Sequence, residues 1–182
     1  MKKYIPLLIV ALSILYQPLY AKEKNVNIYQ SSREAPDTEF YDINGHKLTL
    51  DDFKGKFILL LFWSRDCMPC VRELKSIKGF YDLTHGSNVE MVVISDAKEW
   101  KNADELKNFL KKYKASGLPT YIDRKGKLGE SFGVFTYPHT VLINAKGNEI
   151  GRIRGAADWD DEDVIEYIFK LKAQYNNLWN TN

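Results

Sequence analysis

The chain has 182 residues, of which 45% are hydrophobic and 27% charged, and its formal net charge is +2 at pH 7. This length suffices for one domain with a buried core. The nearly balanced charge gives no general reason to expect nucleic acid or an anionic membrane surface as a partner. The sequence shows no internal repeat and no low-complexity segment, so a single globular domain is expected.

Residues 1–21 have the pattern of an export signal. Two lysines precede an apolar segment from Ile5 to Leu15, and Ala21 offers a small residue for cleavage. The apolar segment is shorter than the ~20 residues that span a bilayer, which favours cleavage. Leu19 is large for a cleavage site, so retention of residues 5–20 as a membrane tether stays open. We expect an exported protein, located in the periplasm or at the extracytoplasmic face of a membrane.

The rest of the chain divides into three parts. Residues 22–39 are polar and lack periodicity, which predicts a linker or an irregular arm. Residues 40–175 alternate between strand and helix patterns and are expected to form the domain, followed by a tail at 176–182. Near the start of the domain, Asn44 and Gly45 separate two short strand-like runs and predict a β-hairpin.

Strand and helix patterns alternate through the domain. The apolar run from Phe57 to Trp63 predicts a strand buried on both faces. Apolar residues then recur at helical spacing from Cys70 to Tyr81, and the run from Val89 to Ser95 predicts a second buried strand. Further elements are expected as a helix around 106–113, strands at 140–143 and 149–154, and a last helix over 164–175. This order predicts an α/β fold with parallel strands in its sheet.

The two cysteines of the chain, Cys67 and Cys70, lie where the first buried strand gives way to a helix. The unpaired amides and the positive end of the helix dipole stabilise an anion there, and a thiolate is an anion. Thiols in such motifs have pKa values of roughly 3.5 to 7.5, against about 8.5 for a free cysteine. A ring closed over two residues constrains the unfolded chain little, so the pair is expected to exchange and not to staple the fold.

Glu73 follows Cys70 by three residues and shares a helix face with Leu74 and Ile77. Its carboxyl group is therefore expected beneath the cysteines, where burial would raise its pKa. The competing interpretation is an ordinary solvated helix residue, like the neighbouring Arg72 and Lys75.

Together these features resemble the TlpA/ResA-like family of exported thioredoxin-fold thiol-disulfide oxidoreductases. The resemblance runs from about Phe40 to about Leu171. It is carried by the strand ending in Phe62-Trp63, by Pro69 before the second cysteine and by the CxxCxxE extension to Glu73. It implies a thioredoxin-like fold with an N-terminal β-hairpin and a central insertion of one helix and one strand, which residues 96–123 would supply.

The resemblance also implies roles. Cys67 would attack a disulfide, Cys70 would resolve the mixed disulfide and Glu73 would handle protons. A cis-proline is implied at Pro138, where the backbone of Tyr137 would bind the extended chain of a client. The implied partners are a client protein with a disulfide, of the cytochrome c maturation or copper-site type, and an upstream electron-donor protein at the membrane. We expect no cofactor and no resident metal.

Several positions depart from the family pattern or leave alternatives. Leu61 stands where thioredoxin has a buried aspartate, so Glu73 would act alone. Trp63 is expected in the core, with a possible second role in contacting substrate. An alternative function is a Cu(I) chaperone that binds the metal through both thiolates and His139. A peroxidase is disfavoured, because Leu60 occupies the proline position of the peroxiredoxin motif. The direction of electron flow is not set by the sequence.

Overall fold

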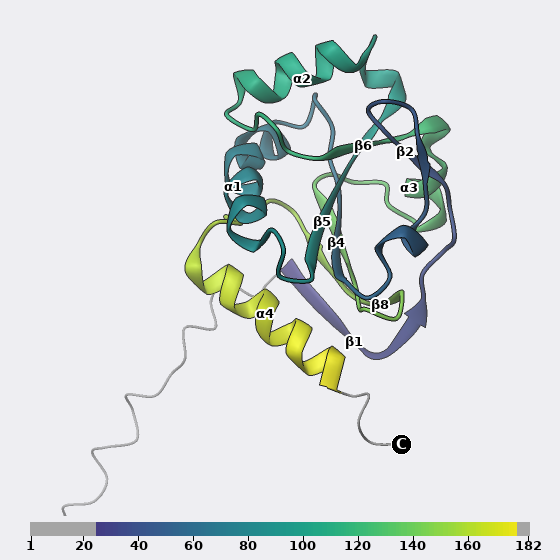
Figure 1. Ribbon diagram of the computed structural model, residues 1–182, viewed down its shortest axis with the longest axis vertical. Helices are drawn as coiled ribbons and strands as arrows, with labels where there is room; N and C mark the ends of the chain where they lie inside the picture. Colours follow the sequence, from purple (N-terminus) through teal and green to yellow (C-terminus); the bar gives the residue numbers. More distant parts are fainter. Residues whose placement is uncertain (1–24, 178–182) are drawn as a thin grey trace, which may run out of the picture.

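The computed structural model describes residues 25–177, so the predicted export signal lies outside the described residues. One mixed sheet of eight strands, in the order β1-β8-β7-β4-β5-β6-β2-β3, crosses the domain (Figure 1). The strands are β1 (Val26–Glu34), β2 (Phe40–Asp42), β3 (Lys47–Leu48), β4 (Phe57–Phe62), β5 (Val89–Asp96), β6 (Thr120–Asp123), β7 (His139–Ile143) and β8 (Asn148–Arg154). The helices are α1 (Met68–Thr84), α2 (Ala103–Lys112), α3 (Lys127–Ser131) and α4 (Glu162–Asn177), with short 3-10 helices η2 (Leu50–Phe53), η3 (Ala97–Glu99) and η4 (Arg124–Gly126).

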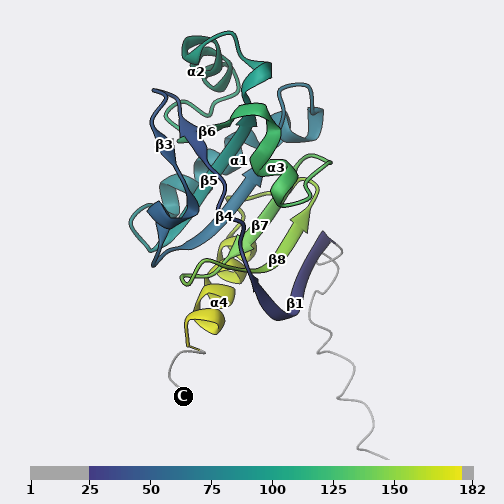
Figure 2. The same ribbon diagram turned by 90° about the vertical axis from the view of Figure 1, so that its right-hand side faces the viewer.

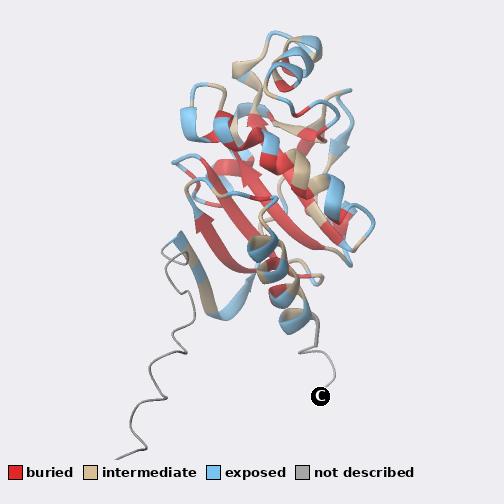
Figure 3. Cartoon of the chain, turned by 90° about the vertical axis from the view of Figure 1, so that its left-hand side faces the viewer, coloured by how far each residue is buried: buried red, intermediate tan, exposed pale blue. Residues whose placement is uncertain are grey.

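The centre of the sheet is β4, whose six residues are all buried. It runs parallel to β5 and antiparallel to β7. Because side chains alternate along a strand, Leu59 and Leu61 pack towards α1 and α4, and Ile58 and Leu60 pack towards α3. Figures 1 and 2 show the helices on these two faces, and Figure 3 shows the central strands as the most buried part of the domain. The apolar run therefore forms the doubly buried strand that the sequence predicts.

Helix α1 begins directly after Cys67, which is its N-cap residue. Pro69 lies in the first turn, where its missing amide hydrogen costs nothing. The helical spacing predicted from the sequence brings Leu74, Ile77 and Phe80 into the core beneath the sheet. The structure thus confirms that the first cysteine stands at the start of a helix.

The predicted insertion forms α2 and β6. Strand β6 extends the sheet by pairing in parallel with β5. The hairpin of β2 and β3 then pairs with β6 through β2, and Gly45 in its turn has the positive φ of +89° that favours glycine. The hairpin and the insertion are therefore neighbours in space, although the sequence separates them. Among residues 25–177, no helix is both long and apolar enough to cross a membrane.

Within the predicted linker at 22–39, residues 26–34 instead form β1 at an edge of the sheet. Strand β1 pairs antiparallel with β8, with Val26 opposite Ile153 and Glu34 opposite Asn148. Its side chains are mostly exposed, so the strand lacks the apolar alternation that would predict it, and backbone pairing holds it in place. Helix α4 continues to Asn177, two residues beyond the expected end of the domain, and the rest of the predicted tail lies outside the described residues.

Glu149 of β8 fixes β1 with its side chain. It is only 1% exposed and accepts hydrogen bonds from Tyr29 Oη at 2.6 Å, Arg33 Nε at 3.1 Å and Arg152 Nε at 2.7 Å. Burial alone would raise the pKa of Glu149, but the hydrogen bonds from Arg152 and Tyr29 lower it below its usual value. The carboxylate is therefore charged and is shared by the two strands.

Replacement of Glu149 by Ala should destabilise the domain by about 3–5 kcal/mol, because Arg152 would be left buried without its anion. The free energy of urea unfolding at neutral pH measures this loss. Glu39→Ala is the control, since Glu39 forms an exposed ion pair with Lys47 and its removal should change stability little. A loss no larger in Glu149→Ala than in Glu39→Ala would contradict the prediction.

Candidate active site

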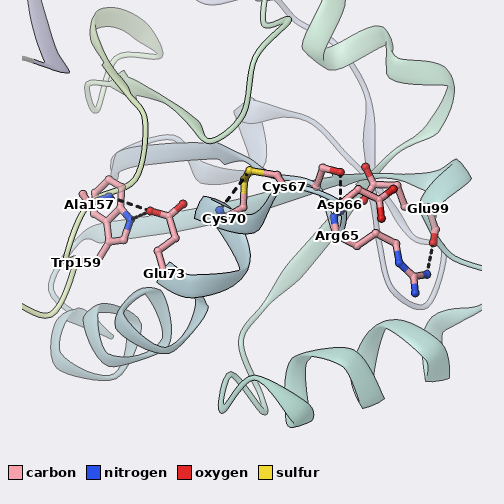
Figure 4. The surroundings of a disulfide bond; sticks show 9 residues. Arg65, Asp66, Cys67, Cys70, Glu73, Glu99, Ala157 and Trp159 are labelled. Carbon is pink, nitrogen blue, oxygen red and sulfur yellow. Dashed lines mark hydrogen bonds between the residues drawn. A yellow bond between two sulfur atoms is a disulfide. The ribbon is translucent and has the colours of Figure 1, made fainter.

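Cys67 and Cys70 form a disulfide, with 2.08 Å between the sulfurs and 5.3 Å between the Cα atoms. The turn of residues 63–66 carries the chain from the end of β4 to the first cysteine. Cys70 is completely buried, whereas Cys67 is only partly buried. The sulfur that another protein can reach is therefore that of Cys67, and Figure 4 shows its surroundings.

The start of α1 favours negative charge on this sulfur. The first turn of the helix contains no acidic residue, so no neighbouring carboxylate of that turn offsets the positive end of the helix dipole. The backbone N–H of Cys70 donates a hydrogen bond to Cys67 Sγ at 3.3 Å. In the reduced protein the same amide is placed to stabilise a Cys67 thiolate.

Glu73 is buried, with 4% of its surface exposed. Its Oε2 accepts hydrogen bonds from the backbone N–H of Ala157 and from Trp159 Nε1, both at 3.0 Å. Its Oε1 is buried without a hydrogen-bond partner among the described residues. Burial raises the pKa of Glu73 to about 7, although both hydrogen bonds act to lower it. The structure thus confirms the buried orientation and excludes the solvated one.

Figure 4 shows the Glu73 carboxyl between the disulfide and the segment that holds Ala157 and Trp159. Sequence reasoning missed these two donors. They lie more than 80 residues from Glu73 along the chain, and no local pattern connects an amide in a loop to a carboxyl on a helix. A cavity of about 340 Å³ adjoins Glu73 and is lined by Pro69, Arg72 and Ser76 among others.

The peptide bond between Tyr137 and Pro138 is cis, as the family resemblance implies. Strand β7 starts at the next residue, His139, which pairs with Phe62 at the end of β4. The cis-proline loop and the CxxC turn therefore lie at the same end of the sheet. Exposed apolar side chains are found in both segments, with exposures of 81% for Phe135, 42% for Tyr137 and 64% for Met68.

Trp63 is not available to a substrate. Only 1% of its surface is exposed, and its ring packs against the rings of Trp100 and Phe109, with centroid distances of 5.8 and 6.0 Å. The core position that the sequence predicts for Trp63 is therefore confirmed, and its burial leaves no surface for the second role in contacting substrate.

His139 is on the opposite face of the sheet from the cysteines. Its side chain lies on the same face as those of Val141 and Ile143, which pack towards α3, whereas α1 covers the other face. Burial lowers the pKa of His139 to about 4, with Arg152 and Arg154 adding to the shift. Within residues 25–177, no group of three or more His, Cys, Asp or Glu side chains is placed to hold a metal ion. His139 is therefore not placed to complete a copper site with the two cysteines.

The fold and the cysteine pair define the class of this protein. A helix that starts at a partly exposed cysteine, a buried second cysteine and a neighbouring buried carboxyl make up the site of a thioredoxin-like thiol-disulfide oxidoreductase. Residues 32–149 match the AhpC/TSA family. The thiol-disulfide oxidoreductase ResA of Bacillus cereus (strain ATCC 10987 / NRS 248) is 34% identical over 157 residues, which cover 86% of each chain. The chain belongs to the AhpC/TSA family and, within it, to the ResA-like thiol-disulfide oxidoreductases.

Solved structures agree with this assignment. StoA from Bacillus subtilis superposes with a TM-score of 0.60 at 26% identity, covering 72% of this chain and 96% of StoA. The exposed lipoprotein thioredoxin Etrx1 from Streptococcus pneumoniae strain TIGR4 gives a TM-score of 0.61 at 26% identity, covering 75% of this chain and 99% of Etrx1. Both matches support the thioredoxin-like fold.

The raised pKa of Glu73 has a consequence for stability. The folded protein holds this proton more tightly than the unfolded chain, so the stabilisation is complete below the usual value of 4.5 and is lost as the pH rises through about 7. Ionisation of the buried group should cost about 3 kcal/mol. Glu73→Gln keeps an oxygen for both donors and should remove this part of the pH dependence. Urea unfolding of the oxidised protein at about pH 5 and about pH 8 measures how the free energy of unfolding changes with pH. An equal change in the parent and in Glu73→Gln would contradict the assignment.

Proposed function

We propose that this protein is an exported reductase that opens disulfides in specific client proteins through Cys67 and Cys70. The observation that carries the proposal is the unequal burial of the two cysteines, with the first partly exposed and the second fully buried beside Glu73. An exposed nucleophile and a shielded partner are what a two-step exchange requires.

The reaction begins with the reduced dithiol. The Cys67 thiolate attacks one sulfur of the client disulfide, and the other client sulfur leaves with the electron pair and takes up a proton. Cys70 then attacks Cys67 Sγ in the mixed disulfide, which releases the second client thiol and closes the Cys67–Cys70 disulfide. Two electrons pass to the client, and an upstream donor must return two electrons before the next cycle.

Glu73 is assigned the proton transfer of the second step. Cys70 must lose its proton before it attacks, and its buried position separates it from bulk water. A carboxyl group with a pKa of about 7 is matched to accept a proton near neutral pH.

The client and the donor follow from the resemblance and from the site. Clients of the cytochrome c maturation type, or proteins with paired copper-site thiols, are the class that the family implies. The backbone of Tyr137 would bind an extended client segment next to the attacked sulfur, with the exposed Phe135 and Met68 as apolar contacts. The pattern of residues 1–21 supports export, and the electron donor would be a membrane protein that reaches the same sulfur.

The equilibrium redox potential of the cysteine pair against glutathione tests the direction of electron flow. A potential near the −270 mV or so of thioredoxin supports a reductase, whereas a potential near about −120 mV, the value of DsbA, would show an oxidant. The measurement uses the purified protein and needs no knowledge of the client.

Substitution of each cysteine should give a different result. Cys67→Ser should abolish exchange with a disulfide substrate, because the accessible nucleophile is lost. Cys70→Ser should still attack but should accumulate a mixed disulfide, which non-reducing electrophoresis and mass spectrometry detect. Full activity in Cys67→Ser, or a stable mixed disulfide on Cys70 in place of Cys67, would refute the assigned roles.

Glu73→Gln should change the pH dependence of exchange while leaving Cys67 reactive. Stopped-flow measurements separate the two steps, and the change is expected in the resolution step that requires Cys70. Lys75→Gln is a suitable control, since Lys75 is an exposed residue on the same helix. Superimposable pH profiles of Glu73→Gln and the parent would show that Glu73 has no part in proton transfer.

A further inference from the structure

Arg65, two residues before Cys67, turns away from the disulfide and binds the insertion. Its Nη1 donates hydrogen bonds to the backbone oxygen of Glu99 at 2.8 Å and to Glu105 Oε1 at 2.9 Å. Its backbone N–H donates to Glu99 Oε2, also at 2.8 Å. Both the backbone and the side chain of this one residue are therefore held by the segment from η3 to α2.

The insertion is organised to receive this arginine. Glu105 also accepts a hydrogen bond from the backbone N–H of Lys101 at 2.8 Å through its other oxygen, so both oxygens of the carboxylate are fixed. The guanidinium carbon lies 4.9 Å from the ring centroid of Trp100 and 5.5 Å from that of Phe109. These two rings pack against Trp63, the first residue of the turn that leads to Cys67.

The two cysteines are thus supported from opposite sides. Figure 4 shows Glu73, Ala157 and Trp159 on the side of Cys70, and Arg65 and Glu99 beyond Cys67. The contacts on the Cys67 side involve no group that reacts. They fix the position of the turn that leads to Cys67.

We propose that Arg65 is a positioning residue that anchors the Cys67 turn to α2, and that the insertion thereby shifts the cysteine pair towards the disulfide form and strengthens it as a reductant. A turn held in place keeps Cys67 Sγ within reach of Cys70, so less conformational entropy is lost when the ring closes. The reaction concerned is the transfer of two electrons from the dithiol to a client disulfide, with closure of the Cys67–Cys70 bond. The proposal deepens the reductase function proposed above and rests on it for its biological meaning.

Arg65→Gln tests the proposal, with Arg72→Gln as the matched control. Arg72 is an exposed arginine on α1, so its replacement removes the same charge near the cysteines without touching the insertion. In Arg65→Gln, the equilibrium constant for disulfide formation against glutathione should fall about tenfold, which corresponds to a rise of ~30 mV in potential. Resolution of the mixed disulfide should slow as well. A potential equal to that of Arg72→Gln would overturn the proposal.

A second variant separates position from charge. Arg65→Gln alone leaves Glu105 without its cation, whereas the double variant with Glu105→Gln removes both charges of the pair. If the turn's position sets the potential, the double variant stays shifted by as much as Arg65→Gln. If the potential of the double variant returns to that of the parent, unbalanced charge caused the shift and the positioning role is wrong. Thermal unfolding of the oxidised proteins verifies that each variant is folded.

The two proposals fail in different ways. A parent potential in the DsbA range would refute the reductase and leave the effect of Arg65 measurable. An unchanged potential in Arg65→Gln would refute the anchoring role and leave the reductase intact.

Discussion

The complete burial of β4 is the constraint on which the site depends. A strand buried on both faces cannot shift by one residue without turning its side chains to the opposite faces. The end of the strand is thereby fixed, and with it the short turn that leads to Cys67 and the first turn of α1. Core packing therefore sets the position of the reactive sulfur, and polar groups only add to this constraint.

The polar groups around the cysteines are not arranged for maximal stability. Among residues 25–177, the buried side-chain nitrogen and oxygen atoms without hydrogen-bond partners belong to Trp63, Glu73 and His139. Buried polar atoms are normally paired, so each of these carries a cost. Trp63 and His139 lie at the end of the sheet where β4 ends and β7 begins, and Glu73 lies on α1 three residues after Cys70. The fold therefore tolerates its unpaired groups where the chemistry takes place, and the shifted pKa of Glu73 is one result.

The sequence predicted what short-range patterns determine. The buried strand, the helix that starts at Cys67 and the buried face of that helix follow from apolar spacing, and all are confirmed. It did not predict β1, whose side chains are mostly exposed, nor the donors at Ala157 and Trp159, which only the tertiary fold brings to Glu73. Nor did it predict the contacts of Arg65 with Glu99 and Glu105, which come from a distant insertion.

The pairing of β1 determines at which end of the sheet the described chain begins. Val26 lies opposite Ile153, Ile153 lies opposite Thr140, and Thr140 lies opposite Leu61 near the end of β4. The first residue of β1 is therefore at the same end of the sheet as Cys67. The length of the sheet therefore does not separate the start of the described chain from the reactive sulfur. Strand β1, which the sequence did not predict, thus places the start of the described chain at the active-site end of the sheet.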